Sequence, residues 1–184
     1  MNAIYFVIKI NFVFGRNVII MSFFTFGDRW KYWLPEPYDC VRGENLYKPY
    51  RTVEAAKKAA QFVLGTQRPD GGFYVPKPGR GGSGLGNYNT SVCVSALYES
   101  GLAPNRAILD ARTYIAGSQL TGDDTMAGGF GYDRVSRRRY ADLSNTSYAL
   151  DAMRRTEGVE EFRPKGEAKA DLNWDKALKF VERL

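Results

Sequence analysis

The feature that most constrains the fold is a short ending that occurs twice in the chain. The stretches "TQRPDGGF" (66–73) and "SQLTGDDTMAGGF" (118–130) each close a helix-like run with a glutamine, a turn that contains glycine and an aromatic residue. The matching pairs are Gln67 and Gln119, Gly71 and Gly128, and Phe73 and Phe130. A signature that recurs after roughly 50–65 residues indicates a structural repeat.

Helical periodicity surrounds both copies of this ending. Apolar side chains recur at helical spacing, and two of the runs begin with the same Asn-Thr-Ser triplet, at Asn89 and at Asn145. Asn89 or Thr90 is expected to cap the second helix, and Gly101 is expected to end it. The predicted helices cover 53–66, 90–100, 105–118, 146–157 and 174–184.

Alternating helices in such a repeat bury their apolar faces on their neighbours. The sequence therefore predicts an all-α fold of repeated helical pairs over 53–184. In that fold 53–66 and 105–118 are equivalent, while 90–100 and 146–157 lie on one common side. Strand-like alternation is nearly absent after residue 30.

The first copy also carries a family resemblance. Its pattern K-A-x-x-F-V-x-x-x-Q-x-x-x-G-x-F at 58–73 resembles the QW repeat of squalene and oxidosqualene cyclases and the related repeat of protein prenyltransferase β subunits. Phe73 and Phe130 stand where the cyclases usually carry tryptophan. The stretch 141–153 also looks like bacterial prenyltransferase/squalene-oxidase-repeat proteins. The resemblance implies an α/α toroid. The duplicated ending itself is interpreted as a structural clamp between helical pairs, in which the amide of Gln67 is predicted to donate to the last carbonyls of its own helix.

In this toroid the inner helices surround a central cavity and the outer helices lie behind them. The outer helices would be 53–66, 105–118 and 174–184, and the inner ones 90–100 and 146–157. Five helices are fewer than the twelve or so that a closed ring needs. The Lys-Ala-Leu-Lys-Phe-Val stretch at 176–181 opens a third copy of the motif that the sequence does not complete. We therefore expect a fragment of a longer reading frame, with an open partial barrel as the alternative.

The catalytic groups of these families were sought in the sequence. Cyclases that resemble this repeat protonate an alkene with an Asp-x-Asp-Asp motif, and Asp123-Asp124 is the only adjacent pair of aspartates. It lies in a loop and is interpreted as a solvated turn. Prenyltransferase β subunits bind zinc through Asp, Cys and His, and histidine is absent here, so that set is incomplete within these residues. We expect no metal site and no cofactor, and whether the protein is an enzyme stays open.

The resemblance also implies which residues would contact a ligand. In such a ring the N-terminal ends of the inner helices open toward the cavity, and their positive dipole ends suit an anion. Aromatic faces there could stabilise a carbocation or line a prenyl-binding cavity. Alternatively, the Asn and Thr residues are helix caps and the tyrosines are packing residues. The candidate cavity-lining residues are Tyr88, Asn89, Thr90, Tyr140, Asp142, Asn145 and Tyr148.

The first 52 residues are read as an irregular N-terminal segment. Its apolar start is interrupted by Lys9, Asn11, Arg16 and Asn17, so no apolar run reaches the roughly 18 residues of a spanning helix. A weak export or anchor signal, a strand-like piece and an upstream extension that precedes a start at Met21 are the alternatives.

The net charge of the chain does not identify a binding partner. The net charge of +6 permits an acidic partner without demanding one, and the basic run at 134–140 is interpreted as a solvated loop. We expect no nucleic-acid partner. Membrane association stays open, and the localisation favoured is cytoplasmic or peripheral to a membrane.

Two functional hypotheses follow. The first is a prenyltransferase/squalene-cyclase-like repeat protein whose complete form acts on an isoprenoid or another apolar small molecule. The second is a non-catalytic helical-repeat binding module on the same scaffold.

Overall fold

The computed structural model divides into two compact units, 1–59 and 60–184, and each unit is considered by itself. The division falls within the first helix. The structure describes residues 8–14, 17–26, 29–33, 53–76, 85–134 and 140–183.

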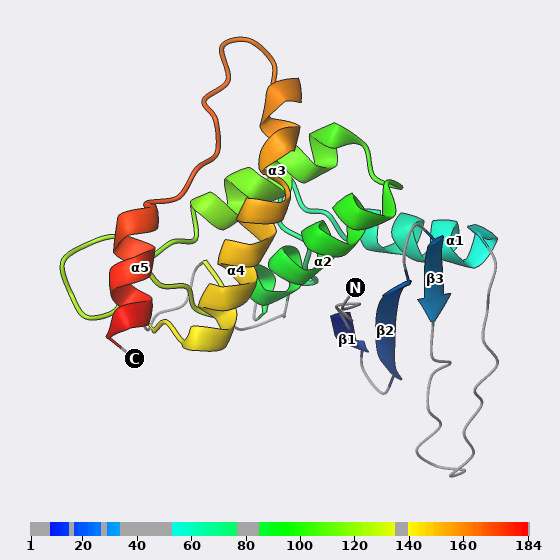
Figure 1. Cartoon of the computed structure of the whole chain (residues 1–184), viewed down its shortest axis with the longest axis horizontal. Helices are drawn as coiled ribbons and strands as arrows, with labels where there is room; N and C mark the ends of the chain where they lie inside the picture. Colours follow the sequence, from blue (N-terminus) through cyan, green and yellow to red (C-terminus); the bar gives the residue numbers. More distant parts are fainter. Residues whose placement is uncertain are drawn as a thin grey trace. The chain divides into compact units, whose positions relative to one another are not determined.

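The N-terminal unit contains a three-stranded antiparallel sheet in the order β1-β2-β3 (Figure 1). The strands are β1 (Ile8–Phe14), β2 (Asn17–Phe26) and β3 (Arg29–Trp33). Ile8 pairs with Phe23, and Ser22 pairs with Trp33. These strands are rich in β-branched and aromatic residues, which favour extended backbone. The irregular segment predicted over 1–52 thus contains strands, and the all-α description applies only to the residues that follow it.

The second part of the chain is helical, as the periodicity predicts. Each predicted helix corresponds to one observed helix, and no strand occurs in the described residues beyond 52. A short 3₁₀ helix, η1, follows the fourth helix. The elements are α1 (Val53–Leu64), α2 (Gly86–Ser100), α3 (Asn105–Ala116), α4 (Leu143–Arg155), η1 (Glu157–Phe162) and α5 (Trp174–Glu182).

Two of the helices, α2 and α4, begin earlier than predicted. α2 begins at Gly86, so Thr90 lies within the helix, donates its hydroxyl to the Gly86 carbonyl and does not act as a cap. In α4 the cap is Asp142, whose carboxylate accepts from the backbone N–H of Asn145. The predicted end of α2 is confirmed, because Gly101 adopts the left-handed conformation with φ of 64° and its N–H bonds the Tyr98 carbonyl.

The helices α2, α3 and α4 and the 3₁₀ helix η1 pack against one another. α2 packs along α4, and α3 packs on α2 and against η1 (Figure 1). The core between them includes fully buried side chains such as Val94 and Ala149. The two helices that carry the Asn-Thr-Ser triplets, α2 and α4, therefore contact each other directly.

Both copies of the glutamine ending make the same long-range contact. The side-chain amide nitrogen of Gln67 donates to the Gly71 carbonyl at 3.1 Å and to the Ala107 carbonyl, in the first turn of α3, at 2.8 Å. That of Gln119 donates to the Gly128 carbonyl at 3.0 Å and to the carbonyl of Asn173, the N-cap of α5, at 3.1 Å. The prediction that the glutamine amide bonds the last carbonyls of its own helix is therefore wrong. Each amide connects its loop to the start of a later helix, α3 for Gln67 and α5 for Gln119.

The glycines of the motif allow this close approach. Gly71 and Gly128 have φ of 89° and 92°, values that favour glycine. A Cβ at Gly71 would collide with the backbone of Asp110 in α3, and one at Gly128 with the backbone of Lys176 in α5. The loops therefore lie directly on the next helix.

The aromatic residue of each copy is buried behind the loop. The backbone N–H of Phe73 donates to the Thr90 hydroxyl at 2.9 Å, and that of Phe130 donates to the Thr146 hydroxyl at 3.0 Å. Phe73 and Phe130 are almost fully buried. The glutamine, glycine and aromatic residue thus act together as a structural clamp, defined here as Gln67–Phe73 and Gln119–Phe130.

The contact of Gly128 with α5 generates a stability prediction. Gly128→Ala introduces both backbone strain and a collision with Lys176, whereas Gly166→Ala introduces the same strain at φ of 95° with open space around the new Cβ. Urea denaturation should therefore show Gly128→Ala as the more destabilising change by about 2 kcal/mol. Equal losses in the two variants would contradict the close-approach role.

Candidate functional site

Two candidate tyrosines meet at the N-terminal turns of the paired helices. The rings of Tyr88 in α2 and Tyr148 in α4 pack edge to face, with centroids 5.3 Å apart and planes at 86°. Tyr88 is half-buried, and Tyr148 keeps 44% of its surface exposed. Partial burial, together with neighbouring Tyr148 and Tyr132, raises the pKa of Tyr88. The phenol is therefore neutral at physiological pH.

An open pocket of about 620 Å³ lies at the start of α4. Two of the predicted residues, Tyr140 and Asp142, line it, and Tyr132 lines it as well. The backbone N–H of Tyr88 lies 3.5 Å from the Tyr132 carbonyl, and Ser147, which also lines the pocket, precedes Tyr148, so the pocket and the Tyr88–Tyr148 pair are neighbours. The lining residues are Tyr132, Tyr140, Asp142, Leu143, Ser144 and Ser147. We call Tyr88, Tyr132, Tyr140 and Tyr148 the tyrosine face.

Tyr132 is the member of this face that the sequence reading missed. Its backbone carbonyl accepts from the N–H of Asn87, in the first turn of α2, at 2.9 Å. The side-chain amide of Asn87 donates to the neighbouring Gly131 carbonyl at 2.8 Å. These contacts join residues more than 40 positions apart, and the clamp motif ends before Tyr132. Its one local signal is its place just after the repeated Gly-Gly-Phe ending.

Asp142 is ionised at neutral pH. Partial burial of the carboxyl opposes ionisation, but hydrogen bonds from Asn145 and Ser144 outweigh it and lower its pKa. One carboxylate oxygen accepts from the Asn145 N–H at 2.8 Å and from the Ser144 hydroxyl at 2.7 Å. Because Asp142 holds no proton at neutral pH, it is unsuited to protonating an alkene and serves as a helix cap.

Three other candidates do not face the pocket. Thr90 and Asn145 are fully buried, and their side chains serve the clamp and the cap of α4. Asn89 is half-buried and is not among the described residues that line the pocket. The interpretation as structural residues therefore fits Thr90 and Asn145, whereas Tyr88, Tyr140, Asp142 and Tyr148 lie at or beside the pocket.

The Asp123-Asp124 pair and the thiol of Cys93 have surroundings that indicate structural roles. The Asp123 side chain is fully exposed and lies 3.5 Å from the Lys176 ammonium, and Asp124 accepts from the Met126 N–H at 3.0 Å. This agrees with a solvated turn. Cys93 is buried in α2, where burial raises the pKa of its thiol, so it packs as a small apolar side chain.

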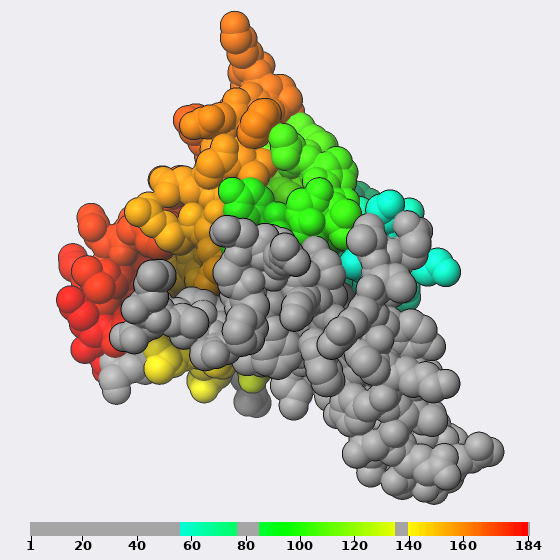
Figure 2. Space-filling model, turned by 45° about the vertical axis from the view of Figure 1, so that its right-hand side comes forward, coloured from blue at the N-terminus to red at the C-terminus, as the bar shows by residue number. Residues whose placement is uncertain are grey.

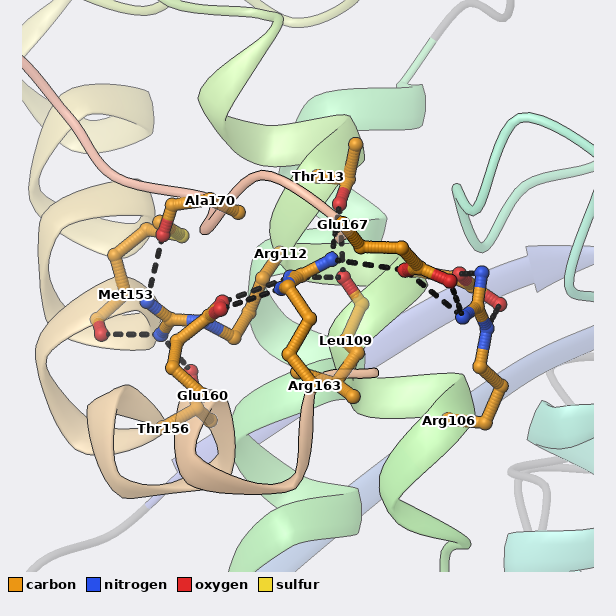
Figure 3. Close-up of polar contacts among 11 residues, drawn as sticks. Arg106, Leu109, Arg112, Thr113, Met153, Thr156, Glu160, Arg163, Glu167 and Ala170 are labelled. Carbon is orange, nitrogen blue, oxygen red and sulfur yellow. Dashed lines mark hydrogen bonds and ion pairs between the residues drawn. The ribbon is translucent and has the colours of Figure 1, made fainter. Parts of the chain in front are cut away.

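A buried network of ion pairs surrounds Arg112 of α3 (Figure 3). The guanidinium of Arg112, 2% exposed, donates to Glu160 at 2.6 Å, to Thr156 at 2.7 Å and to two backbone carbonyls, those of Met153 and Ala170. Arg163 donates to both oxygens of Glu160. The donors of Arg112 are thus used within the protein. The network fastens α3 to α4, η1 and the segment that follows, and it leaves no reactive group for a substrate.

No family model, curated protein or solved structure matches this chain. Within the ranges that the structure describes, no helix is long and apolar enough to cross a membrane. In the same ranges no three His, Cys, Asp or Glu side chains gather as a metal site would require.

The ion network generates a prediction about stability and pH. Burial raises and ion pairing with Arg163 and Arg112 lowers the pKa of Glu160, and the net shift is downward. A carboxylate with a lowered pKa stabilises the fold above the ordinary glutamate pKa, and this stabilisation is lost as the pH falls through the lowered value. Glu160→Gln should cost about 3 kcal/mol at pH 7, because it leaves the buried guanidinium of Arg112 without its counter-charge and leaves Arg163 with Glu167 alone.

Urea denaturation at pH 7 and pH 3 measures this effect. The matched control is Glu157→Gln, whose exposed pair with Arg154 should contribute no more than about 0.5 kcal/mol. The gap between the wild type and Glu160→Gln should narrow at pH 3. A gap that stays constant between the two pH values, or a loss equal to that of the control, would contradict the assignment.

Proposed function

We propose that the helical part of the chain is a partial α/α toroid of the terpenoid cyclase and prenyltransferase kind, and that its tyrosine face binds an isoprenoid or another apolar small molecule. The architectural part of the proposal is supported by the two clamps, which make equivalent contacts to successive outer helices. It is also supported by the direct packing of α2 on α4, the two helices predicted to be inner ones.

The observation that carries the binding proposal is the gathering of tyrosines from both predicted inner helices. Tyr88 and Tyr148 meet edge to face, and Tyr132, which follows the second clamp, contacts the Tyr88 N–H through its backbone carbonyl and lines the adjoining pocket. Tyr132, Tyr140 and Tyr148 each keep between 44% and 56% of their surface exposed. A ligand that removes about 50 Å² of ring from water gains about 1 kcal/mol per ring. Rings with flat, polarisable faces suit the alkene units of an isoprenoid.

The groups at the tyrosine face favour ligand binding over acid catalysis. Its carboxylate, Asp142, is ionised and engaged as a helix cap. A non-catalytic helical-repeat binding module is therefore the second candidate. The ionised state of Asp142 favours this binding module. The module differs from the first candidate because it leaves the bound molecule unchanged.

The binding proposal is tested with the purified chain and radiolabelled farnesol in equilibrium dialysis. Tyr148→Ala and Tyr88→Ala should each weaken binding about fivefold to tenfold, since each removes a ring that the ligand covers. Tyr98→Ala is the matched control, because Tyr98 lies at the other end of α2 with a similar exposure of 37%. Its effect should be within twofold.

Two results would contradict the proposal: no saturable binding of farnesol, or equal losses in the control and site variants. Incubation with farnesyl diphosphate then separates the two candidates. A new organic product supports the catalytic candidate, and unchanged ligand recovered from a saturable complex supports the binding module.

A further inference from the structure

One side of α5 carries an exposed apolar stripe. Trp174, Leu178 and Val181 are spaced by four and three residues, which places them on one face of the helix. Their exposed fractions are 39%, 59% and 37%. Two other residues, Ala177 and Phe180, are buried, with Phe180 packed against Gly129. α5, coloured red, lies at the surface in the space-filling view (Figure 2).

The clamps define which residues of α3 correspond to this stripe. Gln67 bonds Ala107 where Gln119 bonds Asn173, and Gly71 lies on Asp110 where Gly128 lies on Lys176. Both pairs of contacts give the same register between the two helices. In that register Trp174, Leu178 and Val181 correspond to Ile108, Arg112 and Ile115.

The corresponding face of α3 is completely covered. Ile108, Arg112 and Ile115 are 1%, 2% and 0% exposed. Arg112 bonds the Met153 carbonyl at the end of α4 and Glu160 in η1. The end of α4 and η1 therefore cover this face at Arg112, and α3 also packs along α2.

The same holds one repeat earlier. Ala60 and Val63 of α1 occupy the positions of Arg112 and Ile115, and they are 7% and 6% exposed. Of the three outer helices, as far as the structure describes them, α5 alone leaves this face open.

We infer that the Trp174–Leu178–Val181 stripe is a docking site for an amphipathic helix of the α4–η1 type, supplied by a partner polypeptide. The interface already formed on α3 defines the occupant, because the same face in the same register accepts such a helix there. This inference does not depend on the proposed ligand of the tyrosine face.

One substitution between the repeats specifies the occupant further. α5 has Leu178 where α3 has Arg112, so the ion pair with Glu160 has no counterpart. A glutamate at that position of the partner would be buried without a counter-charge, which is costly. The preferred partner therefore has an apolar residue where η1 has Glu160.

The experiment uses the full chain and synthetic peptides of its own residues 143–163. Trp174 reports docking by fluorescence in a background with Trp30→Phe and Trp33→Phe. The peptide that carries Glu160→Leu should bind saturably, with a blue shift as Trp174 leaves water, and about tenfold more tightly than the native peptide. The α3 face of the chain stays occupied by its own α4, which has the higher effective concentration.

Variants of the chain test the stripe itself. Leu178→Asp should weaken the Glu160→Leu peptide at least tenfold, and Leu178→Arg should reverse the preference in favour of the native peptide. Phe162→Asp is the control, since Phe162 is 64% exposed and lies outside the stripe, and it should leave binding unchanged.

Three results would overturn the inference. They are the absence of saturable binding by either peptide, affinities that do not respond to Leu178→Asp, and sedimentation showing that Leu178→Asp converts a dimer of the chain into monomers. The last result would assign the stripe to a second copy.

Discussion

The contact on which the helical unit depends is the glutamine amide that reaches the start of a later helix. α3 ends, its loop folds back, and Gln119 connects that loop to the cap of α5 through the Asn173 carbonyl and N–H. The glycine whose carbonyl shares the amide lies directly against the helix, which only a residue without a Cβ permits. One side chain thus connects α1 to α3 in the first copy and α3 to α5 in the second.

What could be predicted from the sequence is what the two repeats share. Gln67, Gly71 and Phe73 recur, so their structural role was accessible before their contacts were known. The Arg112–Glu160 network could not be foreseen, because it occurs once and joins residues 48 positions apart. Thr90 and Asn145 resemble helix caps in the local sequence, so the caps could not be predicted correctly. In the structure the Thr90 hydroxyl accepts from the N–H of Phe73 in the clamp, and the Asn145 amide donates to the Asp142 carboxylate. The strands near the N-terminus were only one of several readings of an apolar segment.

The clamp loop and the tyrosine face share one stretch of backbone. Gly128 lies on α5, Phe130 bonds Thr146 of α4, and the Tyr132 carbonyl accepts from Asn87 of α2. Four of the seven candidate residues lie at or beside this face, and tertiary contacts rather than local pattern determine which ones. The clamp, which has a structural role and no catalytic group, therefore positions Tyr132, one of the residues proposed to contact a ligand.

The distribution of buried contacts around α3 and α5 also implies a gradient of cooperativity along the helical unit. α3 is anchored on both sides, by α2 and by the network of Arg112. α5 is held through the Gln119 clamp, the packing of Phe180 on Gly129 and the bond from Arg183 to the Ala127 carbonyl. Local opening requires the least free energy where the fewest buried contacts are broken. The unit should therefore loosen from α5 inward, with amide protons of α3 exchanging last, so that the repeat array unfolds directionally.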